Sequence, residues 1–260
     1  MKRRKICEWL CLLIFLLGLL IFCYPSIHKY YVNFKMGQTI QSYLELNAPV
    51  VIEPSEFPQA ESIPSETAQE SLPFVPTTHL ELWHDMKDYN SNLWEDKQDG
   101  LCDAWAYENP SFYLSDYGFS EEAFGILTIP KMDLKMPLYL GATWQHMADG
   151  AAQLSQTSLP IGGMNTNCVI AGHRGWCGAP YFREIMVLDV GDPIYIQNPW
   201  QTLKYQVTEI QIIAPNDVKA IHIKPGRDLV TLLTCHPYAS GGRQRYLVIC
   251  ERSDDVLESK

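Results

Sequence analysis

The stretch DLVTLLTCHPYASGGRQRYLVIC, residues 228–250, contains two apolar runs separated by a polar segment with two adjacent glycines. The first run ends at Cys235, and the second opens at Arg245. Short runs rich in Val, Leu, Thr and Tyr, bounded by Gly-containing turns, are typical of β-strands. We therefore expect two strands here, with a cysteine at the end of one and an arginine at the start of the next.

Five runs of the same kind lie upstream, between Phe124 and Ile213. They read FGILTIP, KMPLYLG, NCVIAGH, DPIYIQN and LKYQVTEIQII. The segments between them are too short for a helix after every strand, although TWQHMADG and YFREIM can form single turns or short helices. The pattern therefore predicts a β-barrel or a β-sandwich with few helices.

The composition is that of one globular domain with extensions. The chain has 260 residues, of which 47% are hydrophobic and 12% aromatic, and this is enough to bury one good-sized core. Its formal net charge is -10. Because nucleic-acid binding relies on clustered Lys and Arg, we expect no nucleic-acid partner.

The N-terminus is typical of a membrane anchor. Basic residues 2–5 precede the apolar run ICEWLCLLIFLLGLLIFCY, which only Glu8 interrupts. From Trp9 onward the run is long enough to span a bilayer, and the basic cluster should stay in the cytoplasm. FCYPS lacks the small residues of a cleavage site. We therefore expect an uncleaved, single-pass anchor at residues 1–25 in the cell membrane, with the rest of the chain outside; a cleaved signal peptide is the alternative.

Two further segments lie between this anchor and the first strand. Residues 26–77 are predicted to form an extracellular, partly disordered spacer that holds the domain away from the membrane, because 49–77 are rich in Pro, Ser and Glu. Helical spacing of apolar residues then predicts a helix at about 79–97. At the other end, residues 254–260 form a polar tail.

Three chemically useful side chains fall at predicted strand ends. NCVIAGH ends in His173, DLVTLLTC ends in Cys235, and Arg245 opens the last run. Groups at strand ends can reach a cleft that a rigid sheet supports. A thiol beside a histidine and a cation gains thiolate character, and an arginine can stabilise an oxyanion. The alternative is a strand-end histidine, a core thiol and a surface charge.

Together these motifs resemble the signature of the sortases, cysteine transpeptidases of Gram-positive surfaces. The matching segments are VIAGH (169–173), TLLTC (231–235) and RYLV (245–248). The resemblance implies a closed β-barrel of about eight strands over residues 124–253, with short flanking helices. It also implies that Cys235 is the nucleophile, His173 the general acid and base, and Arg245 the stabiliser of substrate and oxyanion.

Two neighbouring residues compete for these roles. Arg243 lies in the same turn, but Arg245 directly precedes the apolar run, as the family pattern requires. His236 adjoins Cys235, but adjacent residues on a strand face opposite sides. We therefore favour Arg245 and His173.

A further resemblance concerns the subclass. The CHPY run, the predicted helix and GLCDAWAYENPSF (100–112) are similar to class C sortases, which polymerise pilins. In that class a lid with an Asp-Pro-Trp/Phe motif occupies the active site. The resemblance implies that Asp103 and Trp105 form such a lid within segment 78–123, with Ala104 in place of the proline.

The exported part contains five cysteines, an odd number, so at least one thiol lacks an intramolecular partner. They are Cys102, Cys168, Cys177, Cys235 and Cys250. A lid over the cleft would bring Cys102 and Cys177 within bridging distance, and their disulfide would tether it. The alternatives are two unrelated thiols, or a structural pair formed by Cys168 and Cys250.

The resemblance implies cleavage of an LPxTG-like sorting signal between Thr and Gly through a Cys235 thioester. The acyl group would pass to an amine from a pilin Lys or a cell-wall precursor, without a cofactor or metal. The alternatives are anchoring of surface proteins to the cell wall, or a non-catalytic membrane-anchored binding module. A zinc site is disfavoured because short ligand pairs are lacking. A papain-like protease is disfavoured because its Cys precedes its His.

Overall fold

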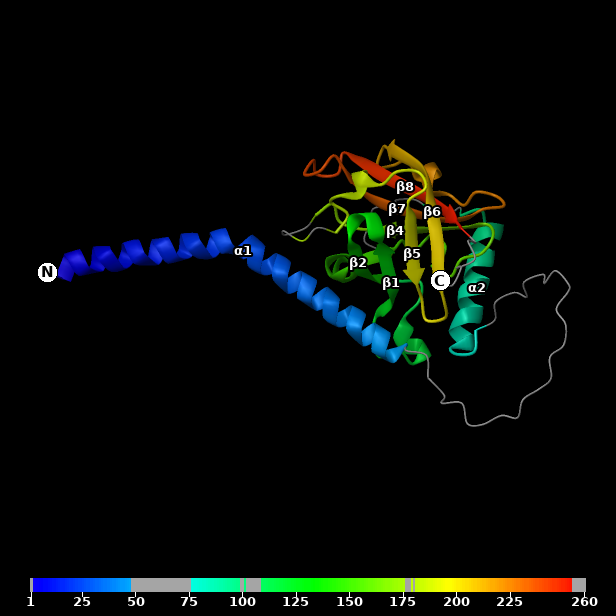
Figure 1. The fold of residues 1–260 in the computed structure, drawn as a ribbon, viewed down its shortest axis with the longest axis horizontal. Coiled ribbons are helices and arrows are strands. Elements are labelled where there is room, and N and C mark those ends of the chain that lie inside the picture. The colour runs from blue at the N-terminus through cyan, green and yellow to red at the C-terminus, as the bar shows by residue number, and fades with distance from the viewer. Residues whose placement is uncertain are drawn as a thin grey trace, which may run out of the picture.

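The computed structural model describes residues 2–47, 76–98, 101, 109–175, 179 and 181–253. Its centre is a closed barrel of eight strands, joined in the order β1-β2-β3-β4-β7-β8-β6-β5 (Figure 1). The strands are β1 (Ala123–Ile129), β2 (Leu134–Leu140), β3 (Ala151–Gln153), β4 (Thr166–Ala171), β5 (Pro193–Gln197), β6 (Thr202–Ile213), β7 (Asp228–His236) and β8 (Gln244–Arg252). The predicted closed barrel is therefore confirmed.

One strand was not among the predicted runs. β3 has the sequence Ala-Ala-Gln and lacks the β-branched and aromatic residues that mark strands. It pairs in parallel with β2 and antiparallel with β4, so it closes the barrel between them. This close packing depends on Gly150, where a Cβ would lie 2.4 Å from the Pro137 carbonyl oxygen.

Three strands that are far apart in the sequence lie side by side. β4 is parallel to β7, with Ala171 opposite Leu233, and β7 is antiparallel to β8, with Cys235 opposite Arg245. A parallel pair requires a long connection, and here β5 and β6 form part of it. The ends of β4 and β7 therefore meet the start of β8 at one end of the barrel, which we call the Cys235 end.

Alternation divides the side chains of these three strands between two buried clusters. Every strand of the barrel contributes to the first, or inner, cluster, which fills the interior. Its members on β4, β7 and β8 include Cys168, Ile170, Leu232 and Val248. The outer cluster lies on the opposite face, and its members there include Val169, Ala171, Leu233 and Leu247.

α1 (Lys2–Leu46) is a single helix that continues beyond the predicted anchor, through residues 26–46. By length and composition, its stretch Glu8–Leu46 is a candidate membrane span. Pro25 lies inside the helix, and Figure 1 shows a bend between the free N-terminal part and the part beside the barrel. Proline accounts for such a bend because it removes a backbone hydrogen bond.

The second half of α1 packs against the barrel. Val32, Met36 and Tyr43 are buried, and the first two belong to the same cluster as the barrel interior. Lys35 Nζ lies 2.6 Å from Asp149 Oδ1. The helix is therefore attached to the barrel by apolar contacts and an ion pair.

Within the described residues, two shorter helices flank the barrel. α2 (Leu80–Glu95) falls where a helix was predicted and buries Leu82 and Met86. α3 (Trp144–Asp149) is the predicted short helix in TWQHMADG. The remaining helical turns are 3₁₀: η1 (Leu114–Tyr117), η2 (Pro130–Met132), η3 (Ile185–Val187), which overlaps YFREIM, and η4 (Val218–Ile221).

Candidate active site

The three predicted site residues occupy adjacent strand ends at the Cys235 end of the barrel. Cys235 is directly opposite Arg245 across β7 and β8. His173 follows β4, two residues beyond the position where Ala171 faces Leu233. Strand pairing thus brings together residues from segments that are distant in the sequence.

Hydrogen bonds hold the ends of β4 and β7 together next to the site. The Gly172 N–H donates to the Leu233 carbonyl oxygen at 3.1 Å, and Thr234 Oγ1 donates to the Gly172 carbonyl oxygen at 2.7 Å. These groups are buried, so water does not compete for the bonds. The placement of His173 relative to Cys235 is therefore set by a bonded pair of strands.

The site lies on the outer face of the barrel. Alternate positions on a strand share a face. The outer cluster contains Ala171, Leu233 and Leu247, which lie two positions from His173, Cys235 and Arg245 respectively. His173 and Cys235 are half-buried and Arg245 is buried. An apolar floor next to polar groups strengthens their electrostatic interactions.

Gly242 lies close to both the thiol and the guanidinium. A Cβ at this position would lie 3.0 Å from Arg245 Nη1 and 3.3 Å from Cys235 Sγ. Its φ is +78°, a left-handed value that favours glycine. Arg245 Nη1 also donates to the Gly242 carbonyl oxygen at 2.6 Å. The turn therefore holds the guanidinium beside the sulfur atom.

The electrostatic environment favours neutral forms of the two reactive groups. Burial raises the pKa of the Cys235 thiol, and the positive charges of Arg245 and Arg174 partly offset this effect. Burial lowers the pKa of the His173 imidazole. At neutral pH the neutral thiol and the neutral imidazole therefore predominate.

Arg174 is a part of the site that the sequence analysis missed. Its side chain is buried, and Nη1 donates to the Cys235 carbonyl oxygen at 3.2 Å and lies 3.3 Å from His236 Nδ1. Nε donates to the Arg183 carbonyl oxygen at 3.2 Å. The signal in the sequence was a cation directly after the strand-end histidine. Arg174 thus connects the end of β4 to the backbone of Cys235.

The two competing residues differ in placement from the predicted site residues. The His236 ring lies 5.6 Å from the Tyr246 ring, centroid to centroid, and Tyr246 belongs to the inner cluster. The Arg243 side chain is exposed, whereas Arg245 is only 4% exposed. The position of His236 agrees with strand alternation, and the burial of Arg245 agrees with its place directly before the apolar run.

The alternative disulfide between Cys168 and Cys250 is wrong. Both thiols are free and buried. They face Val230 from its two sides, on β4 and β8. Two strand spacings amount to roughly 9–10 Å, whereas a disulfide requires Cα atoms less than about 7 Å apart.

The predicted lid residues Asp103 and Trp105 lie outside the described residues, as do Cys102 and Cys177 of the predicted disulfide. Leu101, directly before this segment, is buried in the outer cluster. The chain thus enters the segment on the face that carries the candidate site. Among the described residues, no group of three His, Cys, Asp or Glu side chains is placed to hold a metal ion.

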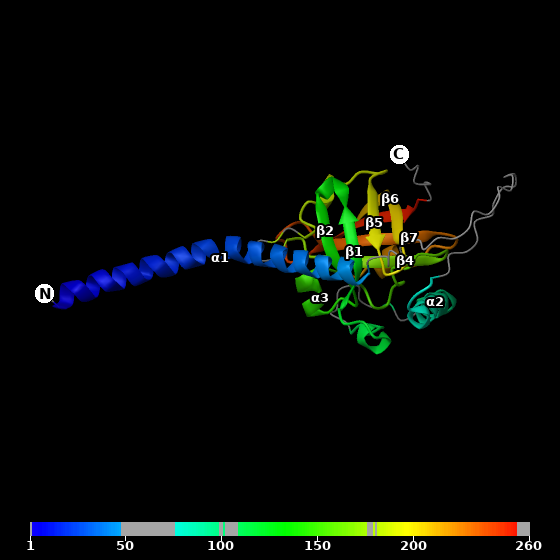
Figure 2. The ribbon, with the colours of Figure 1, turned by 60° about the horizontal axis from the view of Figure 1, so that its bottom comes forward.

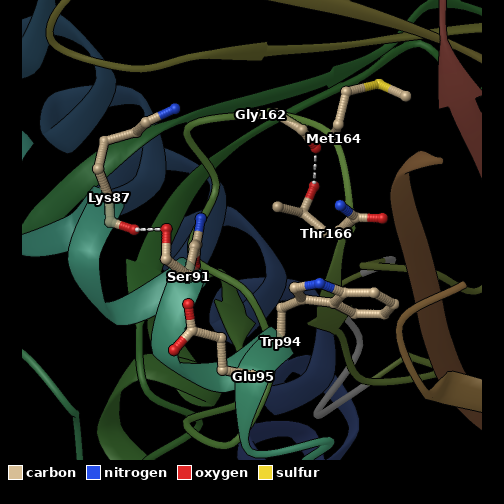
Figure 3. Close-up of a pocket in the computed structure, with 10 residues that line it drawn as sticks. Lys87, Ser91, Trp94, Glu95, Gly162, Met164 and Thr166 are labelled. Atoms are coloured by element: carbon tan, nitrogen blue, oxygen red, sulfur yellow. Dashed lines mark hydrogen bonds between the residues drawn. The ribbon is translucent and has the colours of Figure 1, made fainter. Parts of the chain in front are cut away.

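A cavity of about 200 Å³ lies at the other end of the barrel, where β4 begins (Figure 3). It separates α2 from the segment 162–166, and the residues around it include Lys87, Trp94, Glu95 and Met164. None of the predicted site residues lines this cavity.

A cysteine, a histidine and an arginine at adjacent strand ends define a thiol-based site on a closed β-barrel. Comparison with known proteins identifies the family: the Sortase domain model matches residues 127–253. Sortase C-1 from Actinomyces oris is 32% identical, with a TM-score of 0.60, over 68% of this chain and 99% of that chain. This protein belongs to the sortase family.

Other relatives agree with this assignment. Sortase C from Clostridium perfringens SM101 is 27% identical, with a TM-score of 0.60, over 84% of this chain and 99% of that chain. Sortase A of Bacillus anthracis is 27% identical over 128 residues, which are 49% of this chain and 59% of that protein. Sortase D of Bacillus subtilis is matched over 64% of its length. The chain thus spans about three fifths of these two curated relatives.

Proposed function

We propose that this protein is a membrane-anchored extracellular cysteine transpeptidase, with Cys235 as nucleophile, His173 as general acid and base, and Arg245 as oxyanion stabiliser. The observation that carries the proposal is the meeting of these residues at adjacent strand ends. Membership of the sortase family supports it. The proposed substrate is a protein with an LPxTG-like sorting signal, cleaved between Thr and Gly.

In the first half-reaction, the Cys235 thiol gives its proton to the neutral His173 imidazole as the sulfur attacks the Thr carbonyl carbon. The oxyanion that forms is stabilised by the Arg245 guanidinium, which remains charged throughout. The C–N bond then breaks, and His173 returns the proton to the departing Gly amine. The acyl group remains on Cys235 as a thioester.

In the second half-reaction, an amine attacks the thioester, and His173 transfers a proton from this amine to the departing sulfur. A new amide forms, and the thiol is restored. We propose a pilin Lys as the amine, because the similar structures include "Sortase C1 of GBS Pilus Island 1" and "Pilus-related Sortase C of Group B Streptococcus". An amine of a cell-wall precursor would instead make the protein an anchor of surface proteins.

The same proposal places the N-terminal half of α1 in the cell membrane and the barrel outside the cell. It is supported by the length and apolar composition of Glu8–Leu46 and by the basic residues 2–5, which precede the apolar run. Residues 1–25 would form the cytoplasmic flank and the anchor.

Asp103 and Trp105 are proposed to form a lid over Cys235. Support comes from Leu101, which lies two residues before Asp103 and packs into the outer cluster, on the face of the barrel that carries the site. A disulfide between Cys102 and Cys177 would tether this lid. Peptide mapping of the oxidised protein without reduction tests the disulfide, and recovery of both cysteines as free thiols would contradict it.

The function is tested with the full chain in detergent micelles, an LPxTG peptide and a peptide that supplies a Lys amine. We expect a ligated product by mass spectrometry, and its loss in both Cys235→Ala and His173→Ala. Cys250→Ala, which removes a buried thiol on the inner face, is the matched control and should retain ligation. Ligation by Cys235→Ala would contradict the proposal, and binding of the peptide without cleavage by the unmodified protein would favour a binding module.

A further inference from the structure

α1 leaves the barrel at the end that carries the candidate site. Lys35 of α1 is paired with Asp149 at 2.6 Å, and Asp149 lies two residues before β3 begins. The first residues of β3 pair with the last residues of β4, with Ala152 opposite Ala171. Asp149 is therefore at the Cys235 end. From Lys35, which pairs with it, α1 runs toward its N-terminus away from this end of the barrel.

The two views of the ribbon agree with this placement. In Figures 1 and 2 the N-terminal half of α1 extends to the left, free of the barrel. The turn between β7 and β8, drawn in orange to red, lies on the same side of the barrel in both views. If the free half of α1 crosses a membrane, the Cys235 end faces that membrane.

The length of α1 determines how close the barrel lies to the bilayer. A helix needs about 20 residues to cross a hydrocarbon core of about 30 Å, and the exposed apolar side chains of α1 between Glu8 and Ile27 supply such a stretch. Val32 is already buried against the barrel. The intervening residues 28–31 advance the helix by roughly 6 Å at 1.5 Å per residue. This is about the thickness of one headgroup layer.

Exposed apolar side chains lie at this end of the barrel, in η3 and directly after it. Met186 is 55% exposed and Val190 is 68% exposed. The segment that carries them follows Phe182, whose N–H donates to the His173 carbonyl oxygen at 2.9 Å, and it leads into the start of β5. At a membrane surface, large apolar side chains of this kind are removed from water, which is favourable.

We propose that the Cys235 end of the barrel rests on the outer surface of the bilayer, with α1 as a rigid support and η3 in contact with lipid headgroups. This inference rests on the membrane anchoring in the proposed function. In this arrangement α1 sets the distance between the membrane and the barrel. Residues 49–77 connect α1 to α2 and do not set that distance.

The experiment measures the depth of two labelled positions in vesicles of phosphatidylcholine and phosphatidylglycerol that hold the full chain. Met186→Cys at the Cys235 end and Met164→Cys at the opposite end each receive a fluorophore. Both methionines are exposed, to 55% and 66%, and Figure 3 shows Met164 beside the cavity at the far end. The chain without either substitution is labelled in the same way, and its fluorescence, which comes from the native cysteines, is subtracted.

With a quencher on the lipid headgroups, we expect several times more quenching at position 186 than at position 164. A Gly-Ser insertion of about 20 residues after Lys29 adds reach on the order of 25 Å and should reduce quenching at 186. Equal quenching at both positions, or none at 186, would overturn the proposal. Unchanged quenching after the insertion would overturn the role given to α1.

Neither result depends on catalysis. Cleavage of a soluble sorting peptide by the unlabelled protein tests the proposed function separately, because a soluble peptide does not need a site that faces the membrane. Failure of peptide cleavage would contradict the transpeptidase, whereas failure of quenching would contradict only the orientation.

Discussion

Cys235 and Arg245 occupy the same register position on two antiparallel strands, β7 and β8. Both side chains approach the Cα atom of Gly242 in the turn between the strands. A slip of one residue in either strand would turn one of the two side chains to the inner face. The thiol and guanidinium are therefore brought together by sheet register.

The first prediction concerns Gly242. In Gly242→Ala the new Cβ would lie 3.0 Å from Arg245 Nη1 and 3.3 Å from Cys235 Sγ, so the guanidinium must move. We expect peptide cleavage to fall about tenfold or more, which corresponds to roughly 1.4 kcal/mol in the barrier. Gly241→Ala is the matched control, since its φ of +71° is similar but nothing lies within 4 Å of the added Cβ. Equal loss of cleavage in both variants would contradict the prediction.

The second prediction concerns Arg174 as a positioning residue. Its charge lowers the pKa of Cys235, and its side chain holds the Cys235 carbonyl oxygen. Arg174→Met should move the pH profile of Cys235 alkylation to higher pH and slow alkylation severalfold at pH 7. Arg174→Lys should keep more of the reactivity because it keeps the charge.

The control for this prediction is Arg243→Met, which removes an exposed charge from the same end of the barrel. It should leave the alkylation profile in place. Melting temperatures of all three variants separate a loss of stability from a change in the thiol. A profile that Arg174→Met leaves unchanged would remove Arg174 from the electrostatic account.

The third prediction concerns the pH dependence of the unmodified protein. Burial raises the pKa of Cys235 despite the two arginines, so the thiolate fraction at a given pH is smaller than for a free cysteine. Alkylation should therefore continue to rise above pH 8.5, about the pKa of an unperturbed thiol. The same measurement on the urea-unfolded chain provides the reference. A plateau near pH 7 would show a stabilised thiolate and would contradict this account.

The fourth prediction concerns the proposed lid. A buried Trp contributes a few kcal/mol, whereas an exposed ion pair contributes about 0–1 kcal/mol. Trp105→Ala should therefore raise the rate of Cys235 alkylation more than Asp103→Ala does. If Trp105→Ala lowers the melting temperature and leaves alkylation unchanged, Trp105 is a core residue and the lid is wrong.

Seven of the eight strands were predictable because they are apolar runs bounded by Gly, Pro or Asn. β3 was not, because Ala-Ala-Gln has no strand preference of its own and pairs only where β2 and β4 leave room for it. The helical extension of α1 to Leu46 was also missed. Residues beyond Pro25 have no continuous apolar run, and burial of Val32, Met36 and Tyr43 against the barrel stabilises them as helix.

At the site, strand alternation disfavoured His236, and its position against Tyr246 agrees with that reasoning. Arg245 was preferred over Arg243 because it directly precedes the apolar run, and Arg245 is the buried one of the two. Periodicity could not place His173 beside Cys235, because parallel pairing of β4 with β7 depends on the whole barrel. That expectation came from the resemblance to sortases. For Arg174 the sequence shows only a cation directly after the strand-end histidine. Its bonds to the Arg183 and Cys235 carbonyl oxygens depend on the path of the loop after β4, which the sequence does not indicate.

In the proposed mechanism Cys235 carries the acyl group with the help of Arg245. The most direct measurement is intact-mass spectrometry of the full chain mixed with an LPxTG peptide in the absence of an amine, followed by mapping of the modified peptide. We expect an adduct on Cys235 whose added mass is that of the acyl group of the peptide up to its Thr. Hydroxylamine should remove this adduct and restore the thiol, as it does for a thioester. We also expect a rate of formation reduced several hundredfold in Arg245→Met, on the order of one lost oxyanion donor. An adduct that persists in Cys235→Ala, or no adduct on Cys235 while the peptide is cleaved, would contradict the account.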